Sequence, residues 1–126
     1  MQISLEENET HAIQSYSDTQ VMINHIIHEQ NLVINQENLI TPWSLPSKPS
    51  VDDMQLLLDL KPEIIIIGHA LPTQLHLPAS ISTALAGLRI GIECMPLGAA
   101  CRTYNILLSE KRAVVLGILF HQDNSL

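Results

Sequence analysis

The chain has 126 residues, of which 46% are hydrophobic and 15% charged, so it has enough apolar material for a folded domain and is not intrinsically disordered. Its formal net charge is −7, with only six Lys and Arg residues and 3% aromatic residues. This composition excludes the basic patches and base-stacking platforms of nucleic-acid-binding proteins. Two cysteines are too few for a disulfide scaffold and indicate reduced thiols in the cytoplasm.

The first segment, residues 1–15, is acidic and polar and lacks the basic and apolar regions of a signal peptide. The longest apolar run, residues 113–120, is far shorter than the ~20 residues of a membrane-spanning helix. We therefore expect a soluble, cytoplasmic protein without a transmembrane segment. One domain should cover residues 1–126, with residues 1–15 and 121–126 loose at its ends.

Residues 19–35, TQVMINHIIHEQNLVIN, predict a pair of strands around Val21–Ile23 and Leu32–Ile34, in which successive side chains alternate between the two faces. Asn24-His25 stands where a tight hairpin turn prefers Asn-Gly. We therefore expect a longer loop between the strands.

A Pro- and Ser-rich connector, residues 44–50, precedes a predicted helix that ends before Pro62. Ser50 is its expected N-cap, and Asp53 completes a variant capping box. The helix would bury an apolar stripe formed by Val51, Met54, Leu57 and Leu58.

Four consecutive isoleucines, Ile64–Ile67, cannot alternate between core and solvent, so this run predicts a central, mostly parallel strand that is covered on both faces. A helix should follow from Pro78 and end at Gly87, burying Leu77, Ile81, Leu85 and Leu88. Residues 89–94, RIGIEC, then predict a second buried strand. The two strands would be parallel and joined by a right-handed crossover.

Residues 98–112, GAACRTYNILLSEKR, predict a helix with Leu97, Cys101, Tyr104 and Leu108 on one face. Residues 113–120 form the last predicted strand. Together these elements predict an α/β fold, a three-layer domain with a mixed central sheet, helices packed against it and a β-rich N-terminal segment.

A candidate site follows from this topology. Cys101 would lie in the first turn of the last helix, where free N–H groups and the helix dipole favour a thiolate, and Arg102 adds a cation. The helix begins beyond the carboxyl end of a parallel strand, the usual ligand position in open α/β sheets. The candidate pocket comprises Gly68, His69, Gly98, Cys101, Arg102 and Asn105.

The alternative interpretation gives these residues a structural role. Cys101 would be a small apolar residue of the core, because free cysteine is among the most buried residue types. Arg102 would pair with Glu93, a carboxylate expected inside a strand.

No catalytic residue, cofactor or metal is predicted. GHALP, residues 68–72, lacks the serine of a nucleophile elbow, and the sequence has no glycine-rich nucleotide loop. His25 and His28 would point to opposite faces of a strand and have no obvious third ligand.

The order of these pieces resembles the Mth-type family of domains of unknown function. That family includes assembly factor three of mitochondrial NADH:ubiquinone oxidoreductase and an adipogenesis-associated single-domain protein. The resemblance covers about residues 16–120 and is most specific at residues 98–112, with ITPW and PEIIIIG as supporting matches. Two positions depart from the family: Pro96-Leu97 replace polar residues, and Gly68-His69-Ala70 replaces a Gly-Thr-Gly type of loop.

The resemblance implies a compact three-layer fold and, in some relatives, protein–protein contact during the assembly of a respiratory complex. We therefore expect a non-enzymatic interaction or assembly domain with protein partners, and it could itself form a homo-oligomer. The alternative is a small-molecule or anion-binding protein with a pocket at residues 98–102, which would be thiol-reactive if Cys101 were exposed with a lowered pKa.

Overall fold

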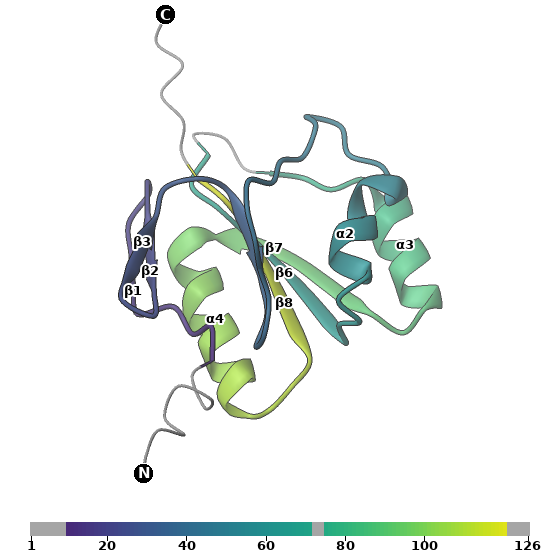
Figure 1. Cartoon of the computed structure of the whole chain (residues 1–126). Coiled ribbons are helices and arrows are strands. Elements are labelled where there is room, and N and C mark those ends of the chain that lie inside the picture. Colours follow the sequence, from purple (N-terminus) through teal and green to yellow (C-terminus); the bar gives the residue numbers. More distant parts are fainter. Residues whose placement is uncertain (1–9, 72–74, 121–126) are drawn as a thin grey trace, which may run out of the picture.

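The computed structural model describes residues 10–71 and 75–120 and shows two sheets and their covering helices (Figure 1). The elements in chain order are β1 (Ser15–Tyr16), β2 (Val21–Ile23), β3 (Ile26–His28), β4 (Leu32–Ile34), β5 (Leu39–Ile40), the 3-10 helix η1 (Val51–Met54), α2 (Gln55–Leu58), β6 (Ile64–His69), α3 (Ala79–Gly87), β7 (Gly91–Pro96), α4 (Leu97–Ser109) and β8 (Val114–Leu119). The mixed α/β fold predicted from the sequence is confirmed.

The larger sheet has the strand order β5-β4-β8-β6-β7. Strands β8, β6 and β7 are parallel, whereas β4 is antiparallel to both β8 and β5. The chain moves outward from β6 to β7 through α3 and then back across β6 to β8 through α4. Because both crossovers are right-handed by the general rule for parallel strands, the two helices lie on opposite faces of the sheet.

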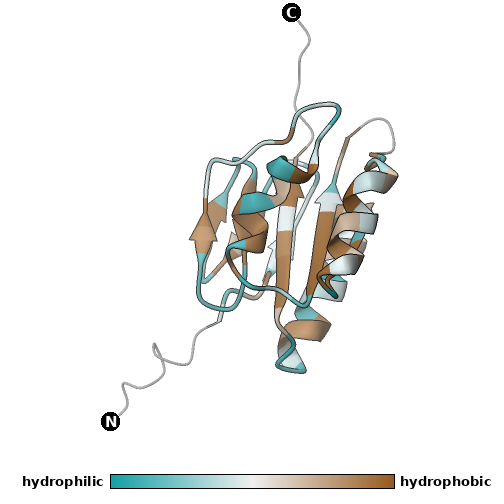
Figure 2. Ribbon diagram, turned by 90° about the vertical axis from the view of Figure 1, so that its right-hand side faces the viewer, coloured by the Kyte–Doolittle hydropathy of each residue, from teal (hydrophilic) through white to brown (hydrophobic). Residues whose placement is uncertain are grey.

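The isoleucine run lies in β6, an interior strand between β8 and the edge strand β7. Ile65, Ile66 and Ile67 are each 0% exposed. Ile66 packs in a cluster with α4, whereas Ile65 and Ile67 pack with Met54, Leu57 and the buried side chains of α3. In Figure 2 the strands are apolar along much of their length, while the helices alternate apolar and polar surface. The prediction of a central strand covered on both faces is confirmed.

The smaller sheet, β1-β2-β3, lies on the same side as α4. Val21 and Ile23 of β2 pack in the α4 cluster, as do Ile13 and the buried face of α4. That face comprises Leu97, Ala100, Cys101, Tyr104 and Leu108, so the predicted apolar stripe of the last helix is confirmed. The three layers are therefore η1-α2-α3, the five-stranded sheet, and α4 with the small sheet.

The link between β2 and β3 corrects one expectation. Ile23 pairs with Ile26, so the connection is a tight two-residue turn and not a longer loop. Asn24 and His25 have φ angles of 51° and 68°. Both residues accept the left-handed conformation that a type I′ turn requires, because Asn and His are enriched there. Residues 26–28, which were expected to lie in that loop, therefore form the strand β3.

Strand β7 corrects a second expectation. Residues 91–96 pair only with β6 and form the edge of the sheet, and half of them are exposed. Gly91–Pro96 is therefore parallel to β6 as predicted, but it is not a buried strand. Glu93 is exposed, so the expected buried carboxylate is also wrong.

The ends of the helices differ from prediction in detail. The capping box of Ser50 and Asp53 is present, but the first helix is only η1 followed by the four residues of α2. Leu88 is 61% exposed and lies outside the buried stripe of α3. Arg89, with φ 63°, and not Gly87, adopts the left-handed conformation after α3.

The N-terminal segment is in part held against the protein. Ile13 is 5% exposed and Ser15 begins β1, although residues 1–15 were expected to be loose. Residues 1–9 and 121–126 lie outside the described residues, so the predicted domain ends stay a prediction there.

Candidate functional site

The polar side chains of α4 contact the chain's own N-terminal segment. The Asn105 side-chain amide donates to the carbonyl of Ile13 at 2.9 Å, and its Oδ1 accepts from the N–H of Ile13 at 2.9 Å. The Tyr104 hydroxyl donates to the carbonyl of His11 at 2.8 Å. These bonds pair backbone groups that β1 alone could not satisfy. Asn105 and Tyr104 therefore act as a clamp on residues 11–13.

The first turn of α4 is covered by an aromatic ring. A Cβ added to Gly98 would lie 2.9 Å from Cε1 of Tyr16, so glycine is needed for the ring to approach this closely. The Arg102 guanidinium donates a hydrogen bond to the Tyr16 hydroxyl. Arg102 therefore bonds to β1 and not to Glu93, and Gly98 supports the same contact.

Cys101 lies in the second turn of α4, which begins at Leu97, and its side chain is 0% exposed. Burial raises the pKa of the Cys101 thiol to about 12, although the nearby Arg102 lowers it in part. The thiol-reactive alternative requires an exposed thiol with a lowered pKa, and the Cys101 thiol is instead buried with a raised pKa. The structural interpretation, in which Cys101 is a core residue, is confirmed.

The Cα of Gly68 faces α4, whereas the side chain of His69 lies on the opposite face of the sheet. A Cβ on Gly68 would lie 2.5 Å from the Cβ of Ala100, so Gly68 allows α4 to pack directly on β6. Side chains alternate along a strand, so His69 shares the face of Ile67 and points away from α4. The structure therefore brings Gly68, Gly98, Cys101, Arg102 and Asn105 together around α4, and it does not bring His69 to them.

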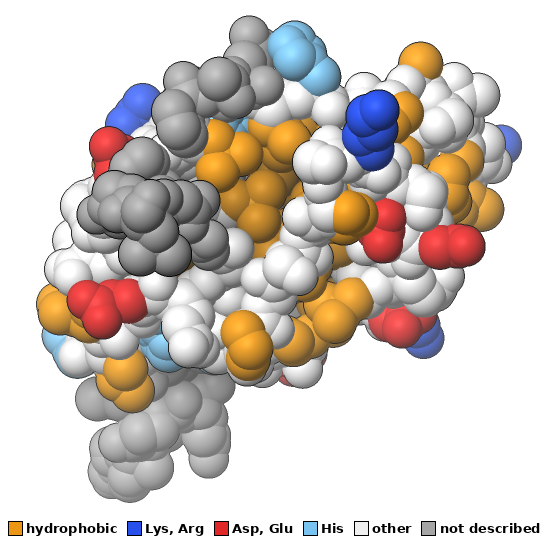
Figure 3. All heavy atoms as spheres, turned by 90° about the horizontal axis from the view of Figure 1, so that it is seen from above, with side chains coloured by type: hydrophobic (Ala, Val, Ile, Leu, Met, Phe, Trp, Pro, Cys, Tyr) orange, Lys and Arg blue, Asp and Glu red, His pale blue; other side chains and the backbone are white. Residues whose placement is uncertain are grey.

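His69 is a polar residue in an apolar setting. It is 8% exposed, its Nδ1 has no hydrogen-bond partner among the described residues, and burial lowers its pKa. Burial therefore favours the neutral form of the imidazole. His69 is the last residue of β6 and pairs with Leu119, the last residue of β8. Seen from above, hydrophobic side chains gather around a hollow at this end of the sheet (Figure 3).

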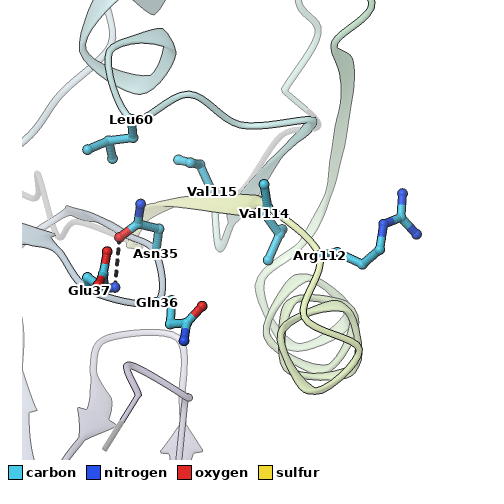
Figure 4. Close-up of a pocket in the computed structure, with 8 residues that line it drawn as sticks. Asn35, Gln36, Glu37, Leu60, Arg112, Val114 and Val115 are labelled. Carbon is cyan, nitrogen blue, oxygen red and sulfur yellow. Dashed lines mark hydrogen bonds between the residues drawn. The ribbon is translucent and has the colours of Figure 1, made fainter. Parts of the chain in front are cut away.

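A cavity of about 130 Å³ opens at the other end of the sheet, where β8 begins. Residues 35–37, Leu60 and residues 112–115 line it. In Figure 4 the Arg112 side chain points away from Asn35, and Arg112 bonds to Glu63, whose pKa this contact lowers. Asn35 Oδ1 accepts from the N–H groups of Glu37 and Asn38 at 3.0 and 2.7 Å. The side-chain oxygen of Asn35 is thus used by a turn, and no sequence motif marks the cavity.

Within residues 10–71 and 75–120, no three His, Cys, Asp or Glu side chains cluster as metal ligands. In the same ranges no helix has the length and apolarity needed to cross a membrane. His25 lies in the turn before β3 and His28 ends that strand.

Comparison with known proteins assigns the chain to one family. Residues 13–119 match a family model described as "Protein of unknown function (DUF498/DUF598)". The chain is 35% identical over 78 residues to a "13 kDa major membrane protein" of Francisella tularensis, a match that covers 56% of this chain and 63% of that relative.

Solved structures share the fold. A Xanthomonas campestris protein is 28% identical, with a TM-score of 0.74 and coverage of 94% of this chain and 91% of that one. A Bordetella pertussis protein described as a Mth938-like domain is 22% identical, with a TM-score of 0.70 and coverage of 86% and 85%. At the latter identity, the likeness shows the fold alone.

Proposed function

This chain belongs to the DUF498/DUF598 family of proteins of unknown function, and we propose that it is a non-enzymatic, cytoplasmic protein-interaction domain that acts in the assembly of a respiratory complex. The proposal treats residues 1–126 as one domain. The respiratory link rests on the resemblance of residues 98–112 to assembly factors. The interaction role rests on what those residues do in the structure.

The observation that carries the proposal is the use of the polar residues of α4. Arg102, Tyr104 and Asn105 all bond to residues 11–16 of the same chain. A reactive centre needs such groups free to meet a substrate. Here they hold β1, and through it the β2–β3 hairpin, against α4. This arrangement supports a role in presenting a surface.

The presented surface is apolar. Ile26 and Ile27 on β3 are 61% and 49% exposed, and Ile106 on α4 is 57% exposed. These exposed apolar side chains are candidate contacts for a protein partner. The small sheet and the outer side of α4 are therefore the regions where we expect a protein partner to dock.

The test is genetic and biochemical. Deletion of the gene in the native host should lower the amount of assembled NADH:ubiquinone oxidoreductase on native gels, without lowering the amounts of its subunits. The wild-type chain and Cys101→Ala should both restore assembly, because the thiol has no chemical role. Unchanged complex levels after deletion would remove the respiratory link. Failure of the tagged chain to retain any protein at physiological salt would remove the interaction role.

His69 favours a second candidate function, the binding of a small polar molecule. Its buried Nδ1 has no partner in the described part of the chain, and it lies at the carboxyl end of a parallel strand, where ligands of open α/β sheets bind. Arg102 bonds to Tyr16 and therefore does not supply the cation of the predicted anion site. Titration of ¹⁵N-imidazole-labelled protein with millimolar inorganic phosphate and with small metabolite pools tests it. An unchanged His69 Nδ1 resonance throughout would end this candidate.

A further inference from the structure

Strand β3 is the outer strand of the small sheet, with β2 as its neighbour among the described residues. Ile26 and Ile27 on it are 61% and 49% exposed. Proteins usually protect such an edge with Lys, Pro or a bulge, because unpaired N–H and C=O groups invite another strand. The three residues of β3 include none of these protective features.

The backbone of Ile27 points toward the free edge. The two-residue turn makes Ile23 and Ile26 a hydrogen-bonded pair, so the next pair, Met22 and Ile27, is not hydrogen-bonded across the hairpin. The Met22 carbonyl fits this alternation, since it accepts from the N–H of Gln14 on the β1 side at 2.8 Å. The N–H and C=O of Ile27 therefore face away from β2.

We propose that two copies of this chain associate through β3, with a two-fold axis at Ile27. The N–H of Ile27 in each copy then donates to the Ile27 carbonyl of the other, and Ile26 lies opposite His28 of the second copy. The two small sheets join into one antiparallel sheet with the order β1-β2-β3-β3-β2-β1. Such isologous pairing is the commonest form of self-association.

Complementary side chains select a second copy as the occupant, because the imidazole of His25 can donate a hydrogen bond to the carboxylate of Glu29. His25 and Glu29 are both exposed and lie two residues before and two residues after Ile27. The two-fold axis therefore places each His25 opposite Glu29 of the other copy, and this contact occurs twice. A register shifted by two residues would lose this match. The inference goes beyond the proposed function, because it needs only the purified chain.

Sedimentation velocity over a concentration series of the purified full chain tests the proposal. The wild type should sediment as a dimer at high concentration. Ile27→Pro removes the outward N–H but no hydrogen bond of the hairpin, and it should give a monomer. Leu88→Lys, at an exposed apolar residue that follows α3 in the opposite layer, is the matched control and should leave the dimer unchanged.

A charge exchange makes the test specific for the register. His25→Asp and Glu29→Lys should each weaken association roughly tenfold, because the first places two carboxylates opposite each other at both contacts and the second removes the carboxylate that accepts from His25. The double variant should recover the wild-type dissociation constant. Asp suits position 25, since it tolerates a positive φ. This set also decides the matter if Ile27→Pro fails to fold.

A wild type that stays monomeric at millimolar concentration would overturn the proposal. So would a dimer that Ile27→Pro and the charge variants leave intact, or one that Leu88→Lys abolishes. In either case the proposed assembly role would stand, because binding of a different protein does not require self-association.

Discussion

The two sheets of this protein use the same amino acid in opposite ways. In the five-stranded sheet, Ile65, Ile66 and Ile67 are fully buried between two layers of helices. In the three-stranded sheet, Ile26 and Ile27 are exposed on an edge strand. The difference shows that the larger sheet supplies the core, whereas the smaller sheet is attached to it through β2 and the clamp from α4. It also places the candidate interaction surface on the smaller sheet.

The largest expected effect separates the two sheets by stability. Ile66→Ala should lower the free energy of unfolding by about 2–5 kcal/mol, because it opens a cavity in a core that cannot collapse around it. Ile27→Ala should lower it by less than about 1 kcal/mol, since half of that side chain already contacts water. Urea denaturation followed by circular dichroism measures both. Equal losses would mean that the small sheet is part of the main core.

The next effect tests the contact between β6 and α4. Gly68→Ala should cost about 1–3 kcal/mol through overpacking, because its new Cβ would lie 2.5 Å from the Cβ of Ala100. Gly68→Ala combined with Ala100→Gly should recover part of that loss, since the colliding atom is removed. The same denaturation experiment measures this coupling. Strictly additive losses would show that the close approach does not limit packing here.

The clamp on the N-terminal segment gives a local effect. Asn105→Ala should cost about 1–3 kcal/mol, because both backbone groups of Ile13 lose their partner. Hydrogen exchange should rise in residues 10–16 and stay low in β6 and β8. Ser109→Ala is a matched control on the same side of α4, since its hydroxyl only donates to the Ile106 carbonyl. Uniform exchange in every region would mean that the two sheets unfold as one unit.

The smallest effect concerns pH. Burial raises the pKa of Cys94 from 9.0 to about 11, and that of Cys101 to about 12. The folded protein therefore keeps thiol protons that the unfolded chain releases above about pH 9, so stability is full below pH 9 and falls as pH rises. The slope should reach up to about 1.4 kcal/mol per pH unit for each thiol. Urea denaturation between pH 8 and 10 measures it.

Cys94→Ala separates the two thiols. This variant should lose the part of the alkaline slope that one thiol contributes, and native alkylation of Cys101 should stay far slower than that of a free thiol at pH 8. Rapid alkylation of Cys101 in the folded protein would contradict its place in the core and would revive the thiol-reactive alternative.

Sequence patterns predicted the larger sheet better than the smaller one. A run such as Ile64–Ile67 has one physical solution, burial on both faces, and the stripe of Leu97, Cys101, Tyr104 and Leu108 has one helical face. The turn at Asn24-His25 was missed because its residues tolerate a positive φ without being the preferred pair. Strand β7 was misjudged because composition does not reveal strand order.

The candidate site was predicted in part. The sequence predicted that Gly98, Cys101, Arg102 and Asn105 lie on one helix, and all four lie on α4. It did not reveal that Arg102 bonds to Tyr16 and Asn105 to Ile13, because those partners are more than 80 residues away in the chain. No local pattern records such contacts.

By itself the sequence determined the elements whose pattern depends on local repetition: the central strand, the last helix and its buried face, the capping box and the parallel crossover. Tertiary structure alone decided that β7 is an edge, that the α4 motif holds the N-terminal segment and that β3 exposes its isoleucines. The physical reason is that the periodicity of a sequence indicates only which side chains must be buried. Which surface receives each side chain depends on elements that the chain brings together from far apart.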